Sequence, residues 1–371
     1  MTEKQRFPVL RIAEQGHFFV GGGYGKTPSG RDVYSGQMYV QFQIPEDRTQ
    51  PFPIVLVHGG GQTSANFTAT PDGRRGWLDY FVAAGYATYV VDQVGRGRSG
   101  FFAEVYGEGT RKPIVDRVQH RFVDPTIRKA WPQAHLYTQG MDGGVIGEEN
   151  FDQFMASQVE DMSDSKLQED LNTNALIGLL ERIGRSVLLT HSQSGAIGWR
   201  VGDARPDLVE ALVAVEPNGP PIGTVEFKGA PDFFDYGVRR AEVVNEDRIW
   251  GVTRGPLQYD PPISDPSELK TTLQEVADAP DLAVCYLEQD PPHRLPELGK
   301  VKIVIVTGEA SYHTSYDHCT AKWLEQAGVA NTHLKLGEIG IHGNGHMMML
   351  EKNNLDVAGA INDWIEANVG S

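Results

Sequence analysis

The 371-residue chain has little cysteine, a deficit of basic residues and no long apolar run. Its two cysteines, Cys285 and Cys319, are too few to indicate a disulfide framework or a metal cluster. We expect them to be packing residues in a reducing compartment. A net charge of −16 argues against nucleic acid or an anionic membrane as a partner.

Two further absences concern location. No 18 apolar residues run together, and residues 1–6 lack the apolar core of a signal peptide. The expectation is therefore a cytoplasmic protein that acts on a small molecule without binding nucleic acid or membrane. The sequence leaves open whether the protein forms a homodimer.

Continuous apolar runs alternate with segments of helical periodicity through most of the chain. The runs cover residues 52–57, 87–92, 186–190, 211–215 and 301–306 and are typical of strands buried on both faces of a sheet. Helical patterns cover residues 77–85, 166–184 and 196–202, and a last helix has Leu355, Ala358, Ile361 and Ile365 on one face. This alternation predicts one α/β domain over residues 1–371, with a mostly parallel sheet and helices on both of its faces.

Two segments interrupt this alternation. Residues 101–165 are rich in glycine, proline and aromatic residues, and residues 220–300 contain several proline pairs. Long irregular segments within a compact domain are usually functional, so we expect the first to form a cap and the second to contribute to it. A surface excursion is the alternative for the first segment. The predicted substrate-contacting residues are Gly61, Trp131, Tyr137 and Phe154, although the aromatic residues of this segment, with Phe151 and Met155, could equally form the core of the cap.

The sequence His191-Ser192-Gln193-Ser194-Gly195 follows one of the buried strands and precedes a helix. A serine on such a tight strand-to-helix turn is exposed for attack, as in the G-x-S-x-G nucleophile elbow. Thr190 and Ser194 stand where that motif has glycine, so the match is imperfect. An ordinary Ser/Gly-rich turn is the alternative.

Other strand ends carry residues that a serine nucleophile requires. His58-Gly59-Gly60-Gly61 follows the strand at 52–57 and resembles the H-G-G-G oxyanion motif of esterases and lipases. Glu216 follows the strand at 211–215, and a histidine-containing loop spans residues 340–346. The order serine, acid, histidine is that of the α/β hydrolases.

Several motifs together resemble one small group of bacterial α/β-hydrolase esterases. They are His58-Gly59, Thr70-Pro71-Asp72-Gly73-Arg74, Gly76-Trp77, Tyr89-Val90-Val91-Asp92-Gln93, Gly95-Arg96-Gly97-Arg98-Ser99, His191-Ser192-Gln193-Ser194-Gly195, Val215-Glu216-Pro217 and His342-Gly343-Asn344-Gly345-His346-Met347-Met348-Met349. The resemblance covers roughly residues 53–100, 186–219 and 339–368. It matches residues 103–160 poorly and omits residues 220–300, so it does not identify the substrate.

The resemblance implies an α/β-hydrolase fold with an eight-stranded type of sheet. In this group the acid follows the sixth strand directly, whereas most α/β hydrolases place it after the seventh. The resemblance therefore implies Ser192 as nucleophile, Glu216 as acid and His346 as base. The backbone N–H groups of Gly60 and Gln193 would form the oxyanion hole.

Two of these assignments have rivals. Glu309 follows the strand at 301–306, the commoner position for the acid, and His342 lies in the same loop as His346. We expect His342 to brace this loop through hydrogen bonds, and we expect His58 and His191 to be satisfied loop histidines.

The remaining motifs favour structural interpretations. Asp92 and Ser99 belong to a sharp loop. His313, Asp317 and His318 lack the further ligands of a metal site, so neither metal nor cofactor is expected. Gly21-Gly22-Gly23 lacks the Lys-Ser/Thr of a phosphate loop and is better explained by a hairpin.

The combined pattern predicts a serine hydrolase that cleaves a carboxylic ester or lactone through an acyl-enzyme. Hydrolysis of a carbon–carbon or amide bond by the same three residues is an alternative, because this fold hosts many chemistries. Acyl transfer to an alcohol and ligand binding on a hydrolase scaffold also remain open.

Overall fold

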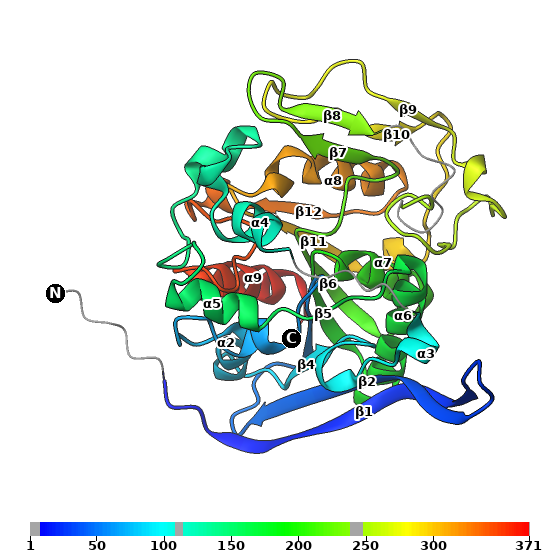
Figure 1. Ribbon diagram of the computed structural model, residues 1–371. Coiled ribbons are helices and arrows are strands. Elements are labelled where there is room, and N and C mark those ends of the chain that lie inside the picture. The colour runs from blue at the N-terminus through cyan, green and yellow to red at the C-terminus, as the bar shows by residue number, and fades with distance from the viewer. Residues whose placement is uncertain (1–7, 108–113, 238–247, 371) are drawn as a thin grey trace.

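The computed structural model describes residues 8–107, 114–237 and 248–370, and it is organised around an eight-stranded sheet (Figure 1). The strand order is β1-β2-β4-β3-β5-β6-β11-β12. The strands are β1 (Ile12–Lys26), β2 (Asp32–Pro45), β3 (Ile54–Val57), β4 (Thr88–Asp92), β5 (Ser186–His191), β6 (Val209–Val215), β11 (Lys302–Thr307) and β12 (Thr332–Lys335). The pairs β1·β2 and β2·β4 are antiparallel, and all other neighbours are parallel. The predicted fold class is therefore confirmed.

Alternate residues of the central strands face two separate apolar cores. In β3, Val55 and Val57 belong to the core beneath α6 and α7, whereas Ile54 and Leu56 belong to the core beneath α2 and α9. Side chains on a strand alternate between faces, so a continuous apolar run is what a sheet covered on both sides requires. The main covering helices are α2 (Trp77–Ala83), α6 (Ser165–Ile183), α7 (Ser194–Ala204), α8 (Asp317–Gln326) and α9 (Asn354–Asn368).

Helix α6 illustrates how local sequence defines an element. The Asp164 carboxylate accepts hydrogen bonds from the backbone N–H groups of Lys166 and Leu167, which caps the first turn. Leu176, Leu179 and Leu180 are fully buried, and Gly184 ends the helix with a φ of 89°. The observed bounds lie within one residue of the predicted 166–184.

The hairpin of β1 and β2 extends well beyond the two short runs visible in the sequence. Gly21 to Gly23 lie inside β1, opposite Gln37 to Ser35 of β2. A Cβ at Gly22 would approach Gln37 N and the Tyr34 ring to 2.9 Å, so the glycine allows close contact within the hairpin.

The two predicted insertions differ in structure. Residues 101–165 contain α3 (Ala103–Tyr106), α4 (Val115–Val118), a π-helical turn η2 (Gln119–Val123), η3 (Pro125–Ile127), η4 (Pro132–Leu136) and α5 (Glu149–Ala156). Residues 220–300 contain the hairpins β7 (Thr224–Phe227) with β8 (Phe234–Gly237) and β9 (Thr271–Leu273) with β10 (Tyr286–Glu288), besides η5 (Pro266–Glu268) and η6 (Leu298–Lys300). Figure 1 shows both hairpins beyond α8, at the β12 end of the sheet.

Short helical turns complete the described chain. They are α1 (Ala65–Thr68), η1 (Gly97–Ser99), η7 (Tyr312–Ser315) and η8 (Leu336–Ile339). None of the described helices combines the length and apolar character needed to cross a membrane.

The expectation for the cysteines is wrong. Cys285, just before β10, forms a disulfide with Cys319 of α8, and their Cα atoms lie 5.2 Å apart. The fold brings together two residues that are 34 positions apart, which the sequence could not show. The cysteines therefore no longer support a reducing compartment, and the cytoplasmic location stays a prediction without that argument.

Candidate active site

The turn between β5 and α7 holds Ser192 in an unusual backbone conformation. Its φ is +54°, a left-handed value that non-glycine residues rarely adopt, and α7 begins two residues later. Such strain persists only where the surrounding structure holds it, and it is concentrated at functional sites. The Ser192 backbone is held by hydrogen bonds from Ser192 N to Val215 O (3.0 Å) and from Asn218 N to Ser192 O (2.8 Å).

The glycines that allow this turn lie within α7, whereas the two glycine positions of the G-x-S-x-G motif are occupied by Thr190 and Ser194. A Cβ at Gly195 would approach the Pro217 Cβ to 2.5 Å, and one at Gly198 would approach the Thr190 Cγ2 to 2.9 Å. Ser194 instead uses its hydroxyl, which accepts from His191 N (2.9 Å) and lies 2.9 Å from Val57 O. This packing explains why the sequence departs from G-x-S-x-G while keeping a tight turn.

Glu216 and His346 form a buried hydrogen-bonded pair. The Glu216 Oε2 atom lies 2.6 Å from His346 Nδ1, and both side chains are at most 1% exposed. Glu216 follows β6 directly with a φ of +43°. Its carboxylate also accepts from Gly308 N (2.8 Å) and Ser311 Oγ (2.7 Å). The structure therefore brings together the two residues predicted from the sequence as acid and base.

Burial controls the electrostatics of this pair. It raises the pKa of the Glu216 carboxyl, and the Asp317 carboxylate adds to the effect, whereas the donors Ser311 and Gly308 oppose it. Burial also lowers the pKa of His346 well below 6.5. When Glu216 is ionised, Nδ1 of a neutral His346 donates to it, and Nε2 is left as a proton acceptor.

Aromatic rings enclose the His346 imidazole. His313 stacks on it with a centroid distance of 4.8 Å and an interplanar angle of 4°, while Tyr312 and Phe122 lie at 4.9 and 5.2 Å. His313 in turn is hydrogen-bonded through Nδ1 to Asp317 Oδ1 (2.8 Å). The ring orientation of His346 is thus set by packing as well as by Glu216.

The rival acid and the rival base bind each other at the surface. His342 Nδ1 lies 3.0 Å from Glu309 Oε1, and the side chains of His342 and Glu309 are 64% and 25% exposed. The second Glu309 oxygen accepts from Gly343 N (2.9 Å). His342 therefore braces the loop, as expected.

A buried carboxyl group holds the loop that carries His346. Glu351 accepts from Asn344 Nδ2 (2.8 Å) and Gly345 N (2.9 Å). Burial raises the pKa of Glu351 to about 8, although these donors act in the opposite direction. No sequence motif pointed to Glu351.

The candidate oxyanion hole is built from two loops. Gly60 follows β3, and Gln193 precedes α7, whose N-terminus favours negative charge. Among the described residues, neither backbone N–H has a hydrogen-bond partner. A Cβ at Gly59 would lie only 3.0 Å from the Ser192 Cβ, so glycine there allows the two loops to meet.

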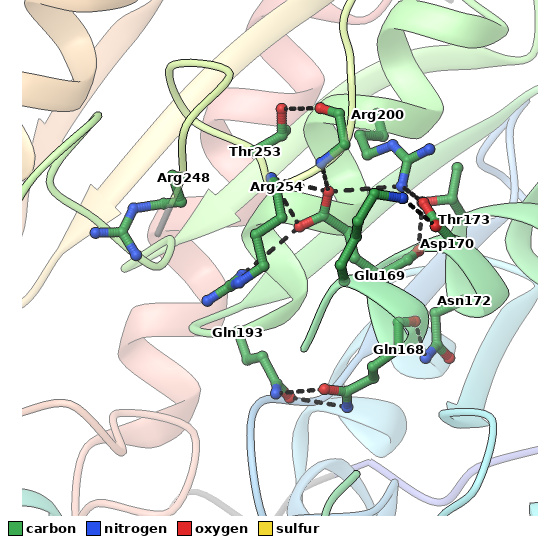
Figure 2. Close-up of polar contacts among 12 residues, drawn as sticks. Gln168, Glu169, Asp170, Asn172, Thr173, Gln193, Arg200, Arg248, Thr253 and Arg254 are labelled. Carbon is green, nitrogen blue, oxygen red and sulfur yellow. Dashed lines mark hydrogen bonds and ion pairs between the residues drawn. The ribbon is translucent and has the colours of Figure 1, made fainter. Parts of the chain in front are cut away.

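Arg96 connects these loops, and sequence analysis missed its role. Its buried guanidinium donates to Gly59 O (2.7 Å), Asp161 Oδ1 (3.1 Å) and Gln193 Oε1 (2.5 Å). Gln193 also donates to Gln168 Oε1 (2.8 Å), as Figure 2 shows. A charged residue between two glycines after a buried strand was a signal that could have identified Arg96.

The other motif residues have structural partners. His58 Nε2 accepts from Gln93 N (3.0 Å), and His191 Nε2 lies 3.0 Å from His346 O. Asp92 accepts from Ser64 and Arg98, and the Ser99 hydroxyl donates to Asp92 O. These contacts agree with the structural roles expected for them.

Ser192 and His346 open into one cavity of about 690 Å³. Gly60, Gly61, Gln193 and Trp131 also line it. Its other aromatic walls come from residues that the sequence did not identify: Phe122, Phe227, Tyr312 and Tyr316.

Tyr137 and Phe154 require a correction, because neither lines this cavity. Phe154 is fully buried in the core beneath α2 and α9. Tyr137 packs instead against Gly345, beneath the histidine loop, and lines a separate, smaller pocket. Apolar periodicity cannot distinguish a cavity wall from a core, because both require large apolar side chains.

The sheet and this arrangement of strand ends are those of an α/β hydrolase. The chain matches the model of the Alpha/beta hydrolase family over residues 54–360 and belongs to that family.

Two similar proteins can be compared over nearly the whole chain. A protein of Fungal sp. (strain ATCC 74256) named "Probable secreted lipase phiG" is 40% identical over 350 residues, which cover 94% of this chain and 88% of that protein. A solved structure described as a novel bacterial esterase is similar over 98% of both chains, with 24% identity and a TM-score of 0.64. At that identity the likeness to the solved structure shows the fold alone.

Proposed function

We propose that the protein is a serine hydrolase that cleaves a carboxylic ester or lactone through an acyl-enzyme. The observation that carries this proposal is the buried Glu216–His346 pair, 2.6 Å apart, which shares a cavity with the strained Ser192. Strained backbone is concentrated at functional sites, and here it occurs at the serine that shares the cavity with the buried pair.

In the first half-reaction, Ser192 Oγ attacks the substrate carbonyl carbon while His346 Nε2 takes the hydroxyl proton. Glu216 holds the imidazole through Nδ1 and stabilises the imidazolium that forms. The tetrahedral intermediate collapses as His346 returns the proton to the leaving alkoxide, which releases an alcohol and leaves an acyl-Ser192 ester.

Water completes the cycle by the same steps in reverse order. His346 removes a proton from water, hydroxide adds to the acyl carbon, and Ser192 leaves with the proton from His346. In both halves the backbone N–H groups of Gly60 and Gln193 bind the oxyanion. Arg96 fixes the distance between these two donors because it bonds to both loops.

The name of the fungal relative, which is 40% identical to this chain, supports an ester as substrate. That relative is named a probable secreted lipase. The motif resemblance to a small group of bacterial esterases, in which the acid follows the sixth strand, points the same way.

The proposal is tested with 4-nitrophenyl acetate. We expect a burst of nitrophenol and an intact mass that rises by one acetyl group, with peptide mapping to Ser192. Ser192→Ala should lose both, whereas Ser29→Ala, which removes an exposed hydroxyl, should keep both. Hydrolysis that survives Ser192→Ala would overturn the proposal. If a matched anilide or β-diketone were turned over faster than the ester, the bond cleaved by this enzyme would be assigned as an amide or a carbon–carbon bond instead.

A further inference from the structure

The walls of the active-site cavity carry an excess of positive charge. Among the described residues, five arginines line it against three acidic residues: Arg117, Arg121, Arg128, Arg248 and Arg254 against Asp116, Asp161 and Glu226. The whole chain has the opposite bias, with 33 basic and 49 acidic residues. The cavity charge therefore does not follow from composition.

Two of the three acidic residues are neutralised locally. Asp116 binds the exposed Arg128 at the rim, with Nη2 2.7 and 2.9 Å from its two oxygens. Asp161 binds Arg96, which lies outside the cavity lining. Glu226 is exposed on β7. With Arg128 paired to Asp116, the other arginines of the described lining are Arg117, Arg121, Arg248 and Arg254.

Arg121 faces aromatic rings instead of carboxylates. Its Cζ lies 4.3 Å from the centroid of the Tyr312 ring and 6.0 Å from that of Phe227. No described carboxylate forms an ion pair with it. Arg121 is half-buried in the π-helical turn η2, and such turns are frequent at functional sites. Stacking fixes the guanidinium plane while leaving its N–H edge suited to a planar anion.

Arg248 and Arg254 are held on another side of the cavity. Arg248 is 4% exposed and donates to Pro220 O (2.9 Å) and Gly223 O (2.8 Å). Arg254 is 6% exposed and lies 3.6 Å from Glu169, which also binds Arg200. Figure 2 shows the guanidinium groups of Arg248 and Arg254 directed to the same side of Glu169. Glu169 thus lies between Arg254 and Arg200, and Arg200 also pairs with Asp170.

The position of Arg121 has a catalytic consequence. Burial, the imidazoles of His191 and His313, and the Arg121 charge all lower the pKa of His346. A permanent cation near this imidazole disfavours the imidazolium that forms during acyl transfer. An anion bound at Arg121 would remove that penalty, so a negatively charged substrate would gain both in binding and in the chemical step.

We propose that the substrate is an ester that carries a carboxylate, and that Arg121 binds this carboxylate with Arg248 and Arg254 completing a positive wall. The inference rests on the proposed function, because the carboxylate belongs to the ester that Ser192 attacks.

Two esters of matched length test the charge preference. The acyl chains of 4-nitrophenyl hemiglutarate and 4-nitrophenyl pentanoate differ by a terminal carboxylate in place of a methyl group. We expect wild type to have a kcat/KM about 10-fold or more higher for the hemiglutarate, because hydrogen bonds to charged groups contribute about that factor or more. Arg121→Gln should abolish the preference, and Arg121→Lys should retain part of it.

Arg205→Gln is the control, because it removes one positive charge from the protein just as Arg121→Gln does. Arg205 pairs with Glu181 and Asp207 at the surface and does not line the cavity. The ratio of the two kcat/KM values should be the same in this variant as in wild type. An equal ratio in wild type and Arg121→Gln, or a wild-type preference for the pentanoate, would overturn the inference. Thermal unfolding of each variant separates loss of cap packing from loss of recognition.

A binding measurement separates this inference from the proposed function. On Ser192→Ala, calorimetry should show monomethyl glutarate binding about 10-fold or more tightly than methyl pentanoate, and the added Arg121→Gln should remove the difference. Charge-selective binding without Ser192-dependent hydrolysis would leave the anion site standing and overturn the proposed function. Ser192-dependent hydrolysis without charge-selective binding would do the reverse.

Discussion

Two glutamate–histidine pairs lie at the same end of the sheet, and only their surroundings distinguish them. Glu216 and His346 are at most 1% exposed and 2.6 Å apart, whereas Glu309 and His342 are 25% and 64% exposed and 3.0 Å apart. The exposed pair is screened by water and contributes little energy. The buried pair is desolvated, enclosed by rings and aimed at the cavity of Ser192. We therefore expect burial and position, more than residue type, to decide which pair is catalytic.

The largest expected effect comes from replacing each histidine by alanine. His346→Ala should lower kcat/KM for 4-nitrophenyl acetate by about 10⁴-fold or more, because it removes the proposed base. His342→Ala removes a brace at the surface and should change kcat/KM by less than about threefold. Steady-state kinetics on both variants measures the two losses. Similar losses in kcat/KM would contradict the distinction between the buried pair and the exposed pair.

Replacing the two glutamates should also reduce activity more in the buried pair than in the exposed pair, although the difference should be smaller than for the histidines. Glu216→Gln preserves the shape of the side chain but presents an amide to His346, which favours the wrong imidazole tautomer. We expect a loss in kcat of about 10³- to 10⁴-fold. Glu309→Gln should retain nearly full kcat. A larger loss in Glu309→Gln than in Glu216→Gln would make Glu309 the acid, as in most α/β hydrolases.

The Ser311 hydroxyl provides a further test of the difference between the two glutamates, because it donates a hydrogen bond to the buried Glu216 and not to Glu309. Ser311→Ala removes the 2.7 Å hydrogen bond to Glu216 and should lower kcat by about 10-fold. Ser29→Ala serves as the control because it removes an exposed hydroxyl. Unchanged kcat in a stable Ser311→Ala protein would show that two donors suffice to hold Glu216.

The pH dependence of stability tests the support of the histidine loop. The pKa of Glu351 rises from 4.5 to about 8 on folding, so the native state binds the proton more tightly than the unfolded chain. This stability is fully present below pH 4.5 and is lost as pH rises through 8, by roughly 1.4 kcal/mol per unit of pKa shift.

Glu351→Gln should remove this loss. Its free energy of unfolding should therefore be larger relative to wild type (the variant relatively more stable) at pH 9 than at pH 5, whereas the exposed Glu325→Gln should show no such trend. A constant difference between Glu351→Gln and wild type from pH 5 to 9 would contradict the assigned role.

Local sequence patterns predicted the scaffold well for a physical reason. A strand such as β6 is buried on both faces and must therefore be largely apolar. The start and end of α6 are marked in the sequence by the capping residue Asp164 and by Gly184. The candidates Ser192 and Glu216 directly follow β5 and β6, and His346 lies in the loop beyond β12 and η8. The carboxyl ends of parallel strands lie along the same edge of the sheet, so such residues come close together.

The rest depends on contacts between distant segments. Arg96 meets Asp161 and Gln193, Ser311 meets Glu216, and Cys285 meets Cys319 only after the fold is formed. The two insertions carry no sustained periodicity, so their hairpins and the cavity walls they supply could not be read from the sequence.

The most direct test of the central claim is covalent trapping with a fluorophosphonate, followed by peptide mass mapping. We expect rapid labelling of Ser192 in wild type and in His342→Ala, and labelling slowed by orders of magnitude in His346→Ala. We expect no label at this position in Ser192→Ala. Equal labelling rates in His346→Ala and wild type, or labelling of another serine, would contradict the claim that the buried pair activates Ser192.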